Sequence, residues 1–197
     1  MNKKFLAMAL ALVLLIGGAV SGSLAWLTDE TDAVTNTFTE SNIAITLEET
    51  KTEFKMIPGW DIEKDPKVTV ESDSEDCYVF VVIEKSKNFD EYLTYAVAEG
   101  WTKLENASGV ISTQSVYYKV FATVDGTTTN EKGKEYSVLK DDKVTVKSDV
   151  TSAQMSAITG ENAAKPLLTF TAYAVQYWTA NGQTWTDAAA AWAEASK

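Results

Sequence analysis

The strongest constraint on the fold of this chain is a series of short runs of β-branched and aromatic residues. Residues 43–48 alternate, with Ile43, Ile45 and Leu47 on one face, which is the period-two pattern of a half-buried strand. Turn signals such as Pro58-Gly59 separate the runs. The other runs are residues 67–70, 77–84, 116–124, 135–139, 144–146 and 167–177.

Six or seven short strands with such turns between them predict an all-β fold and favour a two-sheet β-sandwich over a barrel or an α/β fold. We expect this sandwich domain to span residues 41–197. The run 167–177 is apolar on both faces, and the run 77–84 has the composition of a central strand. We therefore expect both strands to lie in the middle of sheets, covered on two sides.

Three segments show helical periodicity and predict short helical insertions and a C-terminal helix. They are residues 90–98, which precede Gly100, residues 151–158, and residues 184–194. The last segment opens with a Thr184-x-x-Asp187 pattern that resembles a capping box. Trp185 and Trp192 are expected on one face of this helix, packed against the domain.

The N-terminus has the features of a secretory leader. Lys3 and Lys4 precede the apolar run 5–20, and Ser23-Leu24-Ala25 is a small-x-small cleavage site. The apolar run is shorter than the roughly 20 residues of a membrane-spanning helix. We therefore expect residues 1–25 to be a signal peptide that is removed between Ala25 and Trp26, leaving a secreted protein with no stable membrane insertion.

Residues 26–40 are crowded with Thr, Asp and Glu and offer little to bury, which predicts a flexible N-terminal arm. Its few large apolar side chains are candidate anchors for assembly, and its threonines favour the β conformation. The anchors are Trp26, Leu27, Val34 and Phe38.

The charge and cysteine content restrict the partners. A net charge of −11 argues against binding to nucleic acid and to anionic membranes, because both need a basic surface. Cys77 is the only cysteine, so no intramolecular disulfide forms. We expect its thiol to be buried in a central strand, with an intermolecular bridge as the alternative.

The sequence offers few groups for catalysis. It has no histidine, which excludes His-based triads and the usual catalytic zinc motifs, and it has no glycine-rich phosphate loop. The acidic run 73–76 lacks the EF-hand pattern, so it is only a weak indication of calcium. We therefore expect a protein that is not an enzyme and needs no cofactor.

Several short motifs, in order, carry a resemblance to a known family. They are residues 22–29, 36–39, 48–49, 56–59, 64–65 and 68–70. Together they resemble the TasA/camelysin family of Gram-positive bacteria, whose export signals are processed by a SipW-type signal peptidase. Ser41 departs from the pattern, since related proteins often carry glycine there.

The resemblance implies a jelly-roll β-sandwich and a structural role in a biofilm matrix or cell-surface fibre. The partners would be further copies of the chain or related matrix subunits. Some family members have been described as metalloproteases, and the absence of histidine argues against that activity here.

A physical route to assembly is β-augmentation, in which the arm of one subunit satisfies the backbone groups at an open sheet edge of another, as in donor-strand complementation. The alternative function is a secreted carbohydrate-binding module, because flat aromatic rings stack on sugars. Trp60, beside a turn, and Trp178, after the last strand, are the expected exposed rings for such glycan contacts.

Overall fold

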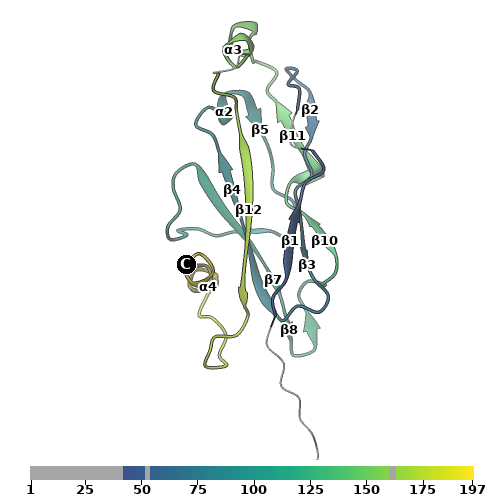
Figure 1. Cartoon of the computed structure of the whole chain (residues 1–197), viewed down its shortest axis with the longest axis vertical. Helices are drawn as coiled ribbons and strands as arrows, with labels where there is room; N and C mark the ends of the chain where they lie inside the picture. The colour runs from purple at the N-terminus through teal and green to yellow at the C-terminus, as the bar shows by residue number, and fades with distance from the viewer. Residues whose placement is uncertain (1–41, 52–53, 160–162) are drawn as a thin grey trace, which may run out of the picture. The chain divides into compact units, whose positions relative to one another are not determined.

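The computed structural model describes residues 42–51, 54–159 and 163–197. The expected leader and the expected arm, including Ala25, Trp26, Leu27, Val34 and Phe38, lie outside the described residues. The described part consists mostly of antiparallel strands with a few helices (Figure 1). It is an all-β, sandwich-like fold with a C-terminal helix, as the sequence predicts.

One layer of the sandwich is a four-stranded antiparallel sheet in the order β12-β4-β7-β6. The central strand β4 bonds to β12 along its whole length and to β7 along nearly all of it. β4 carries the apolar run that predicted a central strand. The strands are β12 (Leu168–Gln176), β4 (Cys77–Lys85), β7 (Gln114–Phe121) and β6 (Thr102–Lys103).

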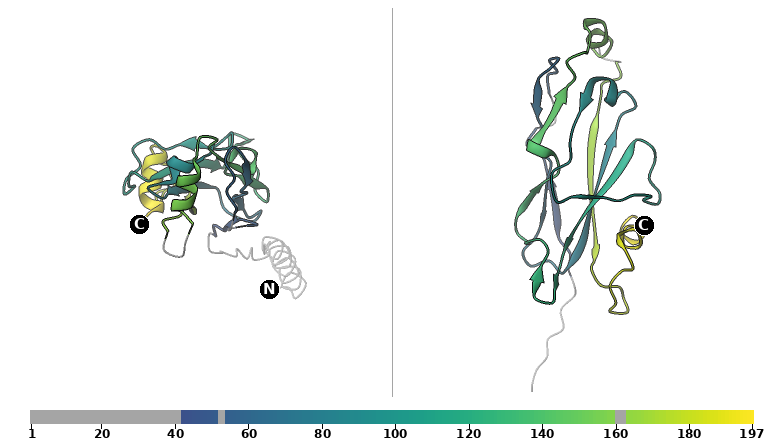
Figure 2. Two further views of the ribbon diagram at one scale, coloured as in Figure 1. Left: turned by 90° about the horizontal axis from the view of Figure 1, so that it is seen from above. Right: turned by 180° about the vertical axis from the view of Figure 1, so that it is seen from behind.

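The opposite layer contains two three-stranded antiparallel sheets, in the orders β1-β3-β10 and β2-β11-β5. The chain runs from β2 into β3 and from β10 into β11, so both sheets belong to one layer (Figure 2). The strands are β1 (Ile45–Glu48), β3 (Lys67–Val70), β10 (Glu135–Ser137), β2 (Asp61–Glu63), β11 (Lys143–Val146) and β5 (Leu93–Thr94).

Short elements complete the described chain. The predicted run 116–124 is interrupted after Phe121, and its end forms a small exposed hairpin, β8 (Thr123–Val124) with β9 (Thr127–Thr128). Asp125 and Gly126 both have positive φ at its turn, as a type I′ turn requires. The helices are α2 (Phe89–Tyr92), α3 (Ser152–Ala157), α4 (Ala188–Ala195) and the 3-10 turn η1 (Lys140–Asp142).

The core has three parts, and β4 contributes to two of them. Between the layers, Val79 and Val81 of β4 pack with Val68 and Val70 of β3. On the other face of β4, Phe80 packs under α4. A third cluster fills the end of the sandwich beside β5 and β11. Since α4 covers the outer face of the sheet, β4 is buried on both faces, which explains its continuous apolar run.

The prediction that β12 lies in the middle of a sheet is wrong. β12 is the end strand of its sheet, although apolar residues occupy both of its faces. Phe170 faces the core between the layers, whereas Tyr173 faces α4. Apolar residues on both faces of a strand indicate that both faces are covered. They do not indicate whether its two edges are paired with other strands, which explains the error.

The predicted helix over residues 90–98 is also largely wrong. Only the single turn α2 forms, and Leu93 then enters strand β5, while Val97 forms a bridge with Leu139. Pairing with β11 supplies hydrogen bonds that outweigh the weak helical preference of this segment. Gly100 adopts a positive φ of 82°, as part of a turn before β6 rather than as a helix cap.

The two later helices agree better with the sequence. α3 carries the full capping box between Thr151 and Gln154. α4 begins later than predicted, because Asp187 rather than Thr184 is its N-cap and accepts from the Ala190 N–H. Trp185 thus precedes the helix, yet it packs in the same cluster as Trp192.

The anchoring role of α4 predicts a large cost for Trp192→Ala. The ring is 3% exposed, lies 5.4 Å from the rings of Phe80 and Tyr173, and donates to the Ser108 carbonyl at 2.9 Å. Urea unfolding should show a loss of about 3–5 kcal/mol. Trp178→Ala, at a ring that is 46% exposed, is the control. Equal losses in the two variants would contradict this role.

Cys77 predicts a specific alkaline loss of stability. The thiol is buried, as expected, and burial raises its pKa from 9.0 to about 11. The stabilisation that comes from keeping this thiol protonated is therefore complete below pH 9 and is lost as the pH rises towards 11. At pH 10 the loss in the free energy of unfolding is about 1 kcal/mol. Urea unfolding between pH 8 and pH 10 should show a steeper decline for the native chain than for Cys77→Ala. Equal slopes would contradict the prediction.

Candidate functional site

The ladder between β12 and β4 determines which backbone groups of β12 point outwards. At its two ends, the Ser86 N–H donates to the Leu167 carbonyl (3.0 Å) and the Tyr177 N–H donates to the Asp76 carbonyl (2.8 Å). Backbone groups alternate in direction along a strand, so the odd-numbered residues of β12 bond to β4 and the even-numbered ones face away. The first four outward-facing residues are Leu168, Phe170, Ala172 and Ala174.

Within the described part of the chain, no strand bonds to this outer edge of β12. At its end, the Trp185 indole N–H donates to the Gln176 carbonyl at 2.8 Å, which covers the last outward position. The side chains of Phe170, Ala172 and Ala174 face the core between the layers. The open backbone groups therefore lie directly beside the apolar interior of the sandwich.

Strand β1 presents a matching edge on the opposite layer. The Glu71 N–H donates to the Ala44 carbonyl at 2.9 Å, so the even-numbered residues of β1 bond to β3. Ile45 and Leu47 consequently direct their backbone groups outwards, while their side chains pack towards the core. β1 thus repeats the arrangement of β12, with open backbone groups on residues whose side chains are half-buried.

β1 and β12 lie beside each other without joining. Their Cα atoms approach within 8 Å, yet no backbone hydrogen bond links them among the described residues. Bonded strands lie about 4.8 Å apart, so two strands with a third between them lie about 9.6 Å apart. This seam, the border between β1 and β12, therefore carries no hydrogen-bonded closure among the described residues, and it is too narrow for a further strand unless β1 moves outward.

The opposite side of the sandwich is closed. Ala98 and Lys140 donate backbone hydrogen bonds across to the Val138 and Ala96 carbonyls, and the Trp101 indole donates to the Ser137 carbonyl at 2.9 Å. The sheet ends there in β6, which is only two residues long and exposed. Short, charged or covered edges resist pairing with other chains. The edge of β12 is therefore the longest open edge that the described residues form.

Lys119 strengthens this closed side. It is only 6% exposed, and its ammonium lies 5.3 Å from the centre of the Trp101 ring and 5.1 Å from that of Tyr136. Burial lowers its pKa. Gly100 leaves the room that this ammonium needs, since a Cβ there would lie 2.5 Å from the Lys119 Nζ. The cation and the two rings thus join both layers without a carboxylate.

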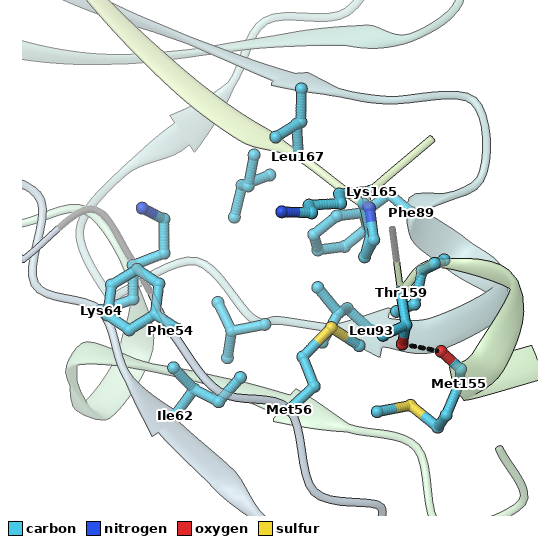
Figure 3. Close-up of a pocket in the computed structure, with 14 residues that line it drawn as sticks. Phe54, Met56, Ile62, Lys64, Phe89, Leu93, Met155, Thr159, Lys165 and Leu167 are labelled. Carbon is cyan, nitrogen blue, oxygen red and sulfur yellow. Dashed lines mark hydrogen bonds between the residues drawn. The ribbon is translucent and has the colours of Figure 1, made fainter. Parts of the chain in front are cut away.

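A pocket of about 640 Å³ lies at one end of the sandwich, beyond the start of β12 (Figure 3). Its walls come from β2 and the segment before it, from α2, β5, β11 and α3, and from the segment that leads into β12. Apolar side chains dominate the lining, and Lys64 and Lys165 lie on opposite sides of it in Figure 3. The apolar walls include Phe54, Met56, Ile62, Leu93, Met155 and Leu168.

Lys64 is held firmly in the wall of this pocket. Its ammonium donates to Glu49 Oε1 at 2.6 Å and lies 5.2 Å and 5.3 Å from the ring centres of Phe54 and Phe170. The side chain is 10% exposed and that of Glu49 is 21% exposed. Nothing in the sequence pattern indicated a buried ion pair here, because both residues occur in polar stretches.

The glycan candidates Trp60 and Trp178 are both exposed, at 63% and 46%. Trp60 directly precedes β2, whereas Trp178 follows the far end of β12, so they lie at opposite ends of the sandwich (Figure 1). Trp178 also stands edge-on to Tyr177, with the ring centres 5.1 Å apart. The two indoles thus form no common platform for a sugar chain.

The acidic run 73–76 does not converge on a common point. Asp76 pairs with Lys132 at 2.8 Å and accepts from the Thr123 N–H, while the Ser74 hydroxyl accepts from the Ala44 N–H. In residues 42–51, 54–159 and 163–197, no group of three or more Cys, Asp or Glu side chains is arranged to hold a metal ion. No helix of the described chain is long and apolar enough to cross a membrane.

Comparisons with models of protein families, with curated proteins and with solved structures yield no match to this chain.

The ion pair beside the pocket predicts unequal effects of two similar substitutions. Glu49→Gln removes the carboxylate from a lysine that is largely buried, which should cost on the order of 2 kcal/mol in urea unfolding, between the values for exposed and buried pairs. Glu63→Gln is the control, because it breaks the Lys51–Glu63 pair, whose side chains are 60% and 70% exposed. Similar costs for both variants would contradict the structural role of Glu49.

Proposed function

We propose that this protein is a secreted structural subunit of an extracellular matrix or cell-surface fibre, assembled by strand exchange. In this proposal the arm of one copy, residues 26–40, adds as a strand to the open edge of β12 in the next copy. The observation that carries the proposal is that long edge, which the fold leaves without a partner strand among the described residues. No catalytic step belongs to this function.

The chemistry of the arm suits the seam. A strand added to β12 can bond to the outward groups of Phe170, Ala172 and Ala174. In an extended arm, Val34 and Phe38 fall on the same face, because they are an even number of residues apart. That face can turn towards the core beside the seam, while the threonines between them favour the extended conformation.

The same geometry explains how a fibre would grow. The donor segment and the acceptor edge are different parts of the chain, so each contact is heterologous and leaves a free arm and a free edge for further copies. The expected cleavage before Trp26 would release the arm during export, by a SipW-type signal peptidase. The resemblance to the TasA/camelysin family supports this reading, and the leader supports secretion.

The proposal predicts that fibre formation needs the arm. A chain that starts at Trp26 should form fibres visible by electron microscopy, whereas a chain that starts at Thr39 should stay monomeric in analytical ultracentrifugation. The shorter chain should still unfold cooperatively, because it retains all the described residues of the sandwich, whereas assembly should raise the apparent stability of the longer chain. Fibres of equal number and length from the two chains would eliminate the arm as donor.

A pair of proline substitutions tests the acceptor edge. Ala172→Pro removes an N–H that points away from β4, and proline is tolerated at such edge positions, so the sandwich should fold while fibre growth stops. Thr171→Pro removes an N–H that bonds to β4 and should destabilise the sandwich by about 3 kcal/mol or more. Fibre growth by a folded Ala172→Pro chain would show that another edge accepts the arm.

A further inference from the structure

The pocket beyond the start of β12 combines an apolar lining with positive charge. Its walls are formed by aromatic, aliphatic and methionine side chains that belong to the cluster at this end of the sandwich. Met56 and Met155 are only half-buried there. A volume of about 640 Å³ falls in the range of sites for small organic molecules, roughly 300–1,000 Å³. The shape and lining thus suit an apolar ligand rather than an ion.

The polar groups of the pocket favour a ligand with a negative charge. Among the described residues, the charged side chains of the lining are Lys64 and Lys165, and none is acidic. Glu49 pairs with Lys64, so Lys165 carries the positive charge that no described carboxylate offsets, in a chain whose net charge is −11. Lys165 is exposed and has neither an ion pair nor a hydrogen bond with any described residue. No described carboxylate therefore competes with an anion for its ammonium.

Lys64 contributes in a different way. Glu49 occupies one of its three N–H donors, and the rings of Phe54 and Phe170 flank the ammonium. This fixed cation lies in the wall of the pocket, while the exposed side chain of Lys165 can reach a head group from the other side. A purely apolar ligand would gain nothing from these charges, and a polyanion would gain nothing from the walls.

We propose that this pocket binds an anionic amphiphile with one alkyl chain and one carboxylate, that is, a medium- or long-chain fatty acid. The alkyl chain lies along Met56, Ile62 and Leu93, and the carboxylate pairs with Lys165. The pocket lies at the N-terminal end of β12, where Leu168 belongs both to the pocket lining and to the outer edge of the strand.

Dodecanoate below its micelle concentration is the probe, measured by isothermal titration calorimetry on the chain that starts at Trp26. Lys165→Gln should weaken binding about tenfold, and Lys165→Arg should retain it. Dodecanol should bind more weakly than dodecanoate, and decanoate about tenfold more weakly, because two buried methylenes are lost. Lys103→Gln, on β6 at the far edge of the sheet, is the matched control and should bind normally.

Met155→Trp tests the apolar part of the site, because a bulkier side chain on α3 occupies part of the pocket. It should weaken binding while the unfolding free energy stays close to that of the native chain. Absence of saturable binding, or equal affinities of dodecanoate for the native chain and Lys165→Gln, would overturn the proposal. Displacement of dodecanoate by a peptide of residues 26–40, with no effect of Lys165→Gln, would instead assign the pocket to the arm.

Discussion

The structure depends on the burial of the central residues of strand β4 on both faces. Its backbone bonds on both sides, to β12 and β7, and its side chains pack on both faces, against the opposite layer and against α4. Burying an apolar strand in this way contributes much of the hydrophobic stabilisation available to a domain of this size. The arrangement of the other elements follows from this burial, since β12 and β7 pair with the two edges of β4 while the opposite layer and α4 cover its two faces.

The two sides of the sandwich, where the edges of its layers meet, are closed to different degrees. On one border Trp101, Lys119 and the segment that pairs with η1 connect the layers. On the other border β12 supplies a full ladder to β4 and has no neighbour strand of its own among the described residues. The open backbone groups there are a consequence of how the core is completed. They provide the physical basis for the assembly that we propose.

The sequence predicted the elements that are determined by local capping residues or by which face of a strand is buried. The strands β1, β3, β4 and β11 and the helix α3 follow directly from alternation, continuous apolar runs or capping residues. The position of β12 could not be predicted, because an edge strand covered on both faces has the same composition as a central one. Residues 90–98 formed strand pairs because a distant partner, β11, supplied the hydrogen bonds.

The candidate site was even less visible in the sequence. The seam between β1 and β12 joins segments more than a hundred residues apart, and its open groups are backbone atoms that carry no residue signature. The pocket likewise combines β2, β5, α3 and the start of β12, and neither of its lysines belongs to a pattern that indicates a binding site. Sequence patterns indicate the arm and the strands, whereas the acceptor edge and the pocket follow only from the topology.

The most direct test of the open edge is amide hydrogen exchange along β12 in the monomeric chain that starts at Thr39. We expect fast exchange at Phe170, Ala172 and Ala174 and slow exchange at Thr169, Thr171 and Tyr173, whose N–H groups bond to β4. Addition of a peptide of residues 26–40 should then protect the fast set. Slow exchange at all six positions before the peptide is added would contradict an open edge at β12.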